Sequence, residues 1–168
     1  ADFNGDDILD LAVSNASSGS ATVLVGDGTG NFTATQSIAV GGTTFSLAIG
    51  DFNSDANADL AIADKDLNTL LIASGDGNGS FTASAPFSSG GVRPAFVEVA
   101  DINNDGFDDL LVANGSSDSI AIHRGVGDGT FSTADVYSTG DFPVSIAAVD
   151  LNEDGWKDVA IANLNGNS

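Results

Sequence analysis

The chain has 168 residues, and its 24 acidic side chains face only four basic ones, which gives a formal net charge of −20 at pH 7. So few lysines and arginines cannot neutralise a phosphate backbone, which argues against nucleic acid as a partner, and the charge argues equally against anionic membrane surfaces. The chain contains no cysteine and no apolar run long enough to span a bilayer, so we expect neither disulfides nor membrane insertion.

Near its start the chain carries an aspartate-rich loop that recurs three more times. The loops begin at Asp2, Asp51, Asp101 and Asp150, at spacings of 49, 50 and 49 residues. Each loop has Asp, Asn, Asp and Asp at its positions one, three, five and nine. Calcium takes six to eight hard oxygen ligands, which alternate side chains and a position-seven carbonyl of a short loop can supply. The pattern therefore indicates a calcium loop, used four times.

Short apolar runs follow each loop in the same order. They are rich in Val, Ile, Phe and Thr, they show no helical period, and a glycine-rich turn ending in Phe separates the second run from the third. No helix pattern follows this turn, which disfavours a phosphate-binding reading. The runs are 11–13, 21–25, 33–40 and 45–49, then 60–62, 70–73, 82–87 and 95–99, then 110–112, 120–122, 132–137 and 144–149, and finally 159–161, with turns at 26–32, 75–81 and 125–131.

Four strands in each unit of about 49–50 residues predict an all-β fold, a β-propeller built of four-stranded blades. Each loop should join the innermost strand of a blade to its second strand. The runs amount to slightly more than three blades in a single propeller segment, 1–168, made of repeats 2–50, 51–100, 101–149 and a partial 150–168.

Propellers usually have about four to eight blades. We therefore expect either a processed or excised part of a longer polypeptide, or copies that close a ring or build a filament through open sheet edges.

Two apolar positions in each repeat should pack between blades. They are loop position two and position ten: Phe3, Phe52, Ile102 and Leu151, and Leu11, Leu60, Leu110 and Val159.

The D-x-N-x-D-G-x-x-D loops, the G-D-G-x-G-x-F turns and the small-residue inner strands (46–48 and 145–148) resemble FG-GAP/VCBS repeats. Such repeats occur in integrin α-chain propellers and in many secreted bacterial proteins. The resemblance covers essentially the whole chain. It implies a β-propeller, usually seven-bladed, with calcium in the loops and a role in extracellular adhesion or binding.

The resemblance implies up to four Ca²⁺ ions, one in each loop. Loop position six, where glycine is expected, is Asp7, Ala56, Gly106 and Gly155. Alanine is strained in the left-handed region, so we predict that the site spanning 51–59 binds most weakly. The alternative is that the loops are Asx-turns without metal, but three converging carboxylates would repel one another without a cation. The expected ligands are Asp2, Asn4, Asp6, Asp10 and the Ile8 carbonyl; Asp51, Asn53, Asp55, Asp59 and the Asn57 carbonyl; Asp101, Asn103, Asp105, Asp109 and the Phe107 carbonyl; and Asp150, Asn152, Asp154, Asp158 and the Trp156 carbonyl.

No residue pattern indicates catalysis or an organic cofactor, and we expect the chain not to be an enzyme. His123 is the only histidine, and we expect it at a solvent-facing strand position. The adjacent Asp108 and Asp109 could suggest a glycosidase pair, but the repeat register already explains Asp109 as a ligand. Trp156 and Tyr137 could stack on a sugar, although packing between blades explains Trp156 equally well.

These observations favour a calcium-stabilised extracellular propeller, secreted or at the cell surface, that serves adhesion, recognition or assembly. Its partners would be an extracellular protein or glycan, further copies of itself, or further blades of the same polypeptide. The alternatives are a carbohydrate-binding propeller (a lectin) and the non-catalytic propeller part of a larger secreted enzyme. The ligand, the number of blades and the face that binds do not follow from the sequence.

Overall fold

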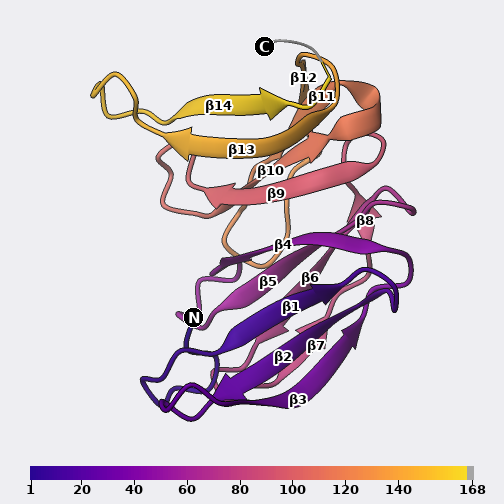
Figure 1. Ribbon diagram of the computed structural model, residues 1–168. Helices are drawn as coiled ribbons and strands as arrows, with labels where there is room; N and C mark the ends of the chain where they lie inside the picture. The colour runs from indigo at the N-terminus through magenta and orange to yellow at the C-terminus, as the bar shows by residue number, and fades with distance from the viewer. Residues whose placement is uncertain (166–168) are drawn as a thin grey trace.

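The computed structural model describes residues 1–165, which form four successive antiparallel sheets (Figure 1). The first sheet contains β1 (Leu11–Asn15), β2 (Ser20–Gly26) and β3 (Phe32–Ala39). The second contains β4 (Thr44–Gly50), β5 (Asp59–Asp64), β6 (Thr69–Gly75), β7 (Phe81–Ala83) and β8 (Phe87–Ser88). The third contains β9 (Pro94–Ala100), β10 (Asp109–Asn114), β11 (Ser119–His123) and β12 (Asp135–Ser138), with a 3₁₀ turn at Gly115–Ser117. The fourth contains β13 (Pro143–Val149) and β14 (Asp158–Asn163).

The sheets are arranged as the blades of a partial β-propeller. Within each sheet, strands that follow one another in the chain pair antiparallel, except that β8 pairs with β6 rather than with β7. The innermost strands β4, β9 and β13 contact one another in turn. As predicted, the last three aspartate-rich loops each join an innermost strand to the next strand of its own sheet: β4 to β5, β9 to β10, and β13 to β14. The predictions of an all-β fold and of four-stranded blades are confirmed.

The outer strands depart in detail from the predicted runs. In the second sheet the predicted run 82–87 divides into β7 and β8, both paired with β6, because Pro86 has no backbone N–H and interrupts the ladder. In the third sheet β12 starts at Asp135, three residues later than predicted, although Ser132 N still bonds Arg124 O.

Hydrophobic contacts join each sheet to the next. Alternate side chains of β5 point to opposite faces, so Leu60 and Ile62 pack toward the first sheet while Ala61 and Ala63 pack toward the third. All six residues of β5 and of β10 are buried, which explains why these runs are continuously apolar rather than alternating. A smaller cluster around Ile146 joins the third and fourth sheets.

The predicted packing at loop positions two and ten holds where another sheet lies alongside. Phe3, Phe52, Leu60 and Leu110 are buried, and Ile102 and Val159 are half-buried. The prediction is wrong for the other two residues at these positions. Leu11 of the first sheet is 44 % exposed and Leu151 of the fourth loop is 66 % exposed, because no further sheet covers either residue within residues 1–165. Over the same residues, no helix is long and apolar enough to cross a membrane.

Candidate metal centres

The four aspartate-rich loops share one hydrogen-bonded conformation. The position-one carboxylate accepts the backbone N–H of position six, at 2.8, 2.9, 2.9 and 2.8 Å in chain order. The position-three asparagine Oδ1 accepts the N–H of position five, and the position-five Oδ1 accepts the N–H of position seven. These are Asx-type turns, in which a short polar side chain replaces the missing backbone partners of a tight bend.

Two residues in every loop have left-handed backbone conformation. Position six was predicted to do so, and its φ is +64°, +67°, +89° and +88° in chain order. Position four does the same, which was not predicted, because Gly5, Ser54, Asn104 and Glu153 share no residue type there. Among the four residues at position six, only Ala56 of the second loop has neither a polar side chain nor glycine's conformational freedom to relieve the strain.

We predict that A56G stabilises the protein by about 0.5–1 kcal/mol. The left-handed conformation costs alanine about 1–2 kcal/mol, and glycine's extra freedom in the unfolded chain offsets part of the gain. Urea denaturation in EDTA measures the change without metal. The reverse substitution in the third loop, G106A, should destabilise by a similar amount, and a loss of stability in A56G would contradict the strain.

The position-nine aspartate is the most buried carboxylate of each of the first three loops. Asp10, Asp59 and Asp109 accept the N–H of loop position two through Oδ2, at 2.8, 3.0 and 3.0 Å. Their Oδ1 accepts the N–H of the first glycine in the following turn, at 2.8 Å each time. Each carboxylate therefore fastens its loop to the glycine-rich turn sixteen residues later, a constant spacing that the sequence displays.

Burial raises the pKa of Asp59 and of Asp109, against the opposing effect of the two backbone N–H groups that each accepts. The carboxylates at positions one and five of the same loop raise the pKa of Asp59 and of Asp109 further, because a nearby like charge disfavours ionisation.

The glycine that bonds the position-nine carboxylate has no room for a side chain. A Cβ at Gly26, Gly75 or Gly125 would lie 2.5, 2.3 or 2.2 Å from the backbone oxygen of loop position eight. This close approach explains why each turn begins with glycine. The later glycines of each turn have a positive φ, which is a separate reason for glycine at those positions.

The first two loops also contact the glycine-rich turn of the next blade. Gly79 N donates to Phe3 O and Gly129 N donates to Phe52 O, both at 2.8 Å. The phenylalanines that end the second and third turns pack edge-on against the aromatic rings at position two of the first and second loops: the Phe3 and Phe81 ring centroids are 5.3 Å apart, and those of Phe52 and Phe131 are 5.5 Å apart. This connection was not predicted, although the phenylalanine that recurs at the end of each turn is a signal for it.

Neighbouring loops touch directly. Asp51 N donates to Asp108 Oδ2 at 2.9 Å, and Asn104 Nδ2 donates to Gly155 O at 2.9 Å. Asp108 thus points to the second loop, whereas Asp109 is buried under its own loop. The two adjacent carboxylates do not form a shared pair.

The loops do not hold a preassembled cluster of charged ligands. Among residues 1–165 no three acidic, histidine or cysteine side chains gather as a metal-binding group. The carboxylates face backbone N–H groups instead, and in the first three loops the asparagine Nδ2 donates to the position-five carboxylate at 2.8–3.0 Å. The expected convergence of three carboxylates is therefore not observed, and Asx-turns account for the hydrogen bonds.

The donor chemistry of the loops nevertheless fits calcium. Every loop offers hard oxygens from four side chains and one carbonyl, as Ca²⁺ prefers. A carboxylate oxygen that accepts one hydrogen bond keeps a lone pair for a cation. The twenty ligand assignments remain a prediction.

His123 contradicts its predicted solvent-facing position. It is 3 % exposed, because its strand β11 lies in the interior of the third sheet. Trp156 is 56 % exposed, so it does not pack between blades within the described residues, and Tyr137 is 50 % exposed.

Family comparison supports the repeat assignment. A model of the FG-GAP-like repeat matches residues 2–62, 51–112 and 101–161. The chain belongs to the FG-GAP-like repeat family. The matches overlap because each begins at one aspartate-rich loop and ends just beyond the next, so an FG-GAP-like unit includes the loops on both sides of a blade. Among curated protein sequences, no relative matches the chain.

Solved structures share the fold of these FG-GAP-like repeats. The periplasmic gluconolactonase PpgL of Pseudomonas aeruginosa aligns with a TM-score of 0.68 at 18 % identity, over 94 % of this chain and 40 % of that one. An Agrocybe aegerita lectin, described as recognising non-reducing terminal N-acetylglucosamine, aligns with a TM-score of 0.63 at 21 % identity, over 95 % and 44 %. The chain thus spans less than half the length of either protein.

The similarity to a gluconolactonase contradicts the expectation that this chain is not an enzyme, and we correct it. A protein of the same fold carries a name that denotes catalysis, so the lack of a familiar catalytic motif excludes nothing. The physical reason is that propellers present functional groups from loops whose spacing varies freely between proteins. At 18 % identity the similarity shows the fold alone and assigns no activity.

Proposed function

We propose that the chain is a calcium-stabilised propeller module that serves extracellular recognition, adhesion or assembly. The observation that carries the proposal is the fourfold repetition of one oxygen-rich loop, in the same conformation, at the junction between blades. The second loop contacts its own turn, the next turn and the next loop, so a cation bound there would stabilise several elements at once.

Charge supports the same proposal. At −20 the chain repels itself, and each Ca²⁺ would cancel up to about two charges near the loops. Within a loop the side-chain oxygens of positions one, three, five and nine would hold the ion together with the position-seven carbonyl. The bound cation would supply positive charge that ties the loop down. Loops of this type suit the millimolar calcium outside cells, which is our reason for proposing an extracellular location.

Calcium is expected to raise the melting temperature. For dissociation constants of about 0.1–1 mM, 10 mM Ca²⁺ should add about 1.4–2.7 kcal/mol for each occupied site. Thermal denaturation in 10 mM CaCl₂, in 10 mM MgCl₂ and in EDTA measures the effect, and isothermal titration counts the sites. Identical melting in calcium and in EDTA would reject the structural metal.

The second loop should bind most weakly, because Ala56 strains it. Two matched substitutions test this: D51A and D101A remove the same loop position from the second and third sites. We expect D101A to lose more of the calcium-dependent rise in melting temperature than D51A. Equal losses would show that Ala56 does not weaken its site.

A carbohydrate-binding role is the second candidate. The exposed aromatic rings of Trp156 and Tyr137 are surfaces on which a sugar could stack, and the similar Agrocybe aegerita protein is a lectin. A glycan array probed in calcium distinguishes the candidates. Saturable binding that W156A abolishes would favour the lectin, and an array without binding would favour protein recognition or assembly.

A further inference from the structure

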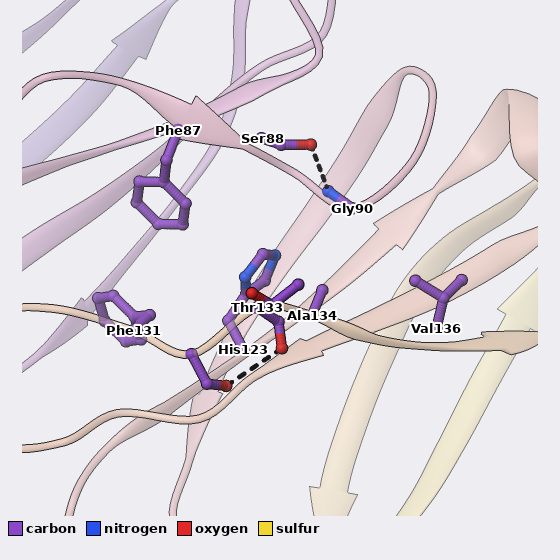
Figure 2. Close-up of a pocket in the computed structure, with 9 residues that line it drawn as sticks. Phe87, Ser88, Gly90, His123, Phe131, Thr133, Ala134 and Val136 are labelled. Carbon is purple, nitrogen blue, oxygen red and sulfur yellow. Dashed lines mark hydrogen bonds between the residues drawn. The ribbon is translucent and has the colours of Figure 1, made fainter.

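A cavity of about 460 Å³ lies between the second and third sheets, away from the ligand positions of the loops (Figure 2). Phe87 and Ser88 of β8 line one side, and His123 of β11, the segment 131–134 and Val136 of β12 line the other. Its volume falls within the range of small-molecule sites, about 300–1,000 Å³. The Phe87 and Phe131 rings stack with centroids 5.8 Å apart, and Phe87 also meets the His123 ring edge-on at 5.5 Å.

His123 has a buried ring nitrogen for which the protein provides no hydrogen-bond partner among residues 1–165. His123 is only 3 % exposed, and its Nε2 has no hydrogen-bond partner within residues 1–165. A buried polar group without a partner costs about 1–3 kcal/mol, so a ligand that bonds it gains from the contact. Burial lowers the pKa of His123, against a smaller opposing effect from the backbone of Ser89 and Ser132, which favours the neutral imidazole.

The histidine also departs from the repeat. Strand pairing sets position ten of each repeat opposite one residue of the next strand: Leu11 faces Leu24, Leu60 faces Ala73, and Leu110 faces His123. Two of the three repeats therefore fill this interior position with an apolar side chain. Because the fold accepts Ala or Leu here, it does not require an imidazole.

The two serine hydroxyls of the cavity are already engaged. Ser132 Oγ accepts Arg124 N at 3.1 Å and donates to Thr133 O at 3.3 Å, and Ser88 Oγ accepts Gly90 N at 3.2 Å. Gly90 keeps the space beside the imidazole open, since a Cβ there would lie 3.6 Å from Nε2 and 2.6 Å from the Ala121 Cβ. The cavity thus offers aromatic walls, the unpaired Nε2 of His123 and the hydroxyl of Thr133.

We propose that this cavity binds a small uncharged molecule with one apolar ring and one hydroxyl group, which hydrogen-bonds His123 Nε2 while the ring packs against Phe87 and Phe131. A hydroxyl both donates and accepts, so it matches either neutral tautomer of the imidazole. A sugar fits less well, because its other hydroxyls would lose water without finding partners. The proposal does not depend on calcium in the loops.

Phenol and toluene are the matched probes, because phenol carries a hydroxyl group where toluene carries a methyl group on the same ring. His123 is the only histidine, so the imidazole ¹⁵N resonances of the intact protein report on it without assignment. We expect phenol to shift the Nε2 resonance saturably and to bind about 3- to 10-fold more tightly than toluene, the factor that one hydrogen bond supplies. N-acetylglucosamine should leave the resonance unchanged.

H123A supplies the control, because alanine already occupies this register position in the second repeat. It should keep toluene binding, followed through the ligand's own NMR signals, and lose the preference for phenol. No saturable shift in the wild-type protein, or a phenol preference that survives in H123A, would overturn the site. A saturable response to N-acetylglucosamine instead would overturn the assigned ligand class. The wild-type titration decides the question even if H123A fails to fold.

Discussion

Replacing Asp59 or Asp109 with alanine is expected to lower the free energy of unfolding by about 2–6 kcal/mol, even without metal. Each carboxylate is fully buried and accepts two backbone N–H groups, one from its loop and one from its turn. Alanine leaves both donors buried without partners, at about 1–3 kcal/mol each. Urea denaturation of D59A and D109A in EDTA measures the loss.

Asp158 is the matched control. It occupies the same position nine, but it is only half-buried and its one hydrogen bond among those described comes from the exposed Leu151. Water can satisfy that N–H when the carboxylate is removed, so D158A should change stability far less. If D59A and D158A are equally mild in EDTA, the position-nine carboxylates matter only as calcium ligands and the hydrogen bonds described here contribute little.

The repeat period explains why so much of the fold was predictable. A loop that returns every 49 or 50 residues fixes the order of strands on both sides. The thirteen predicted runs match the strands of the four sheets once β7 and β8 are taken as one interrupted strand. The left-handed residue at loop position six was predictable too, because glycine occupies that position in two copies. Position four was not, since its residue type differs in each copy.

Burial was harder to predict than order. Asp59 was predicted only as a calcium ligand, and its hydrogen bond to the turn glycine was not foreseen. The sequence contained a signal for that bond, because Gly75 follows Asp59 by sixteen residues, just as Gly125 follows Asp109. His123 was placed in solvent because a lone histidine next to Arg124 looks like a surface residue. Its alignment with Ala73 and Leu24 would have placed it in the interior. In a propeller both faces of a middle blade are covered, so polarity alone is a poor guide to exposure.

The loops show the limit of a motif. Residue types and spacing specify which oxygens lie near one another, but the same side chains satisfy the loop's own backbone donors in the structure. Only the free energy of cation binding relative to these hydrogen bonds decides between a metal site and an Asx-turn. The sequence pattern does not specify this difference in free energy.

Replacing Phe52 with alanine is expected to cost about 3–5 kcal/mol, because it opens a cavity between two blades. Its ring is 2 % exposed and packs against Phe131, while its carbonyl accepts Gly129 N. Leu151 occupies the same loop position two in the fourth repeat but is 66 % exposed. L151A should therefore change the free energy of unfolding by less than about 0.5 kcal/mol.

The pair separates packing between blades from the loop itself. Both substitutions leave every proposed calcium oxygen in place, and both remove a large apolar side chain from the same position of the same motif. Urea denaturation in calcium compares them directly. A cost for L151A as large as that for F52A would mean that Leu151 is covered in solution, and light scattering would then show whether a second copy of the chain covers it. A small cost for both would mean that the aromatic contact between loop and turn does not hold neighbouring blades together.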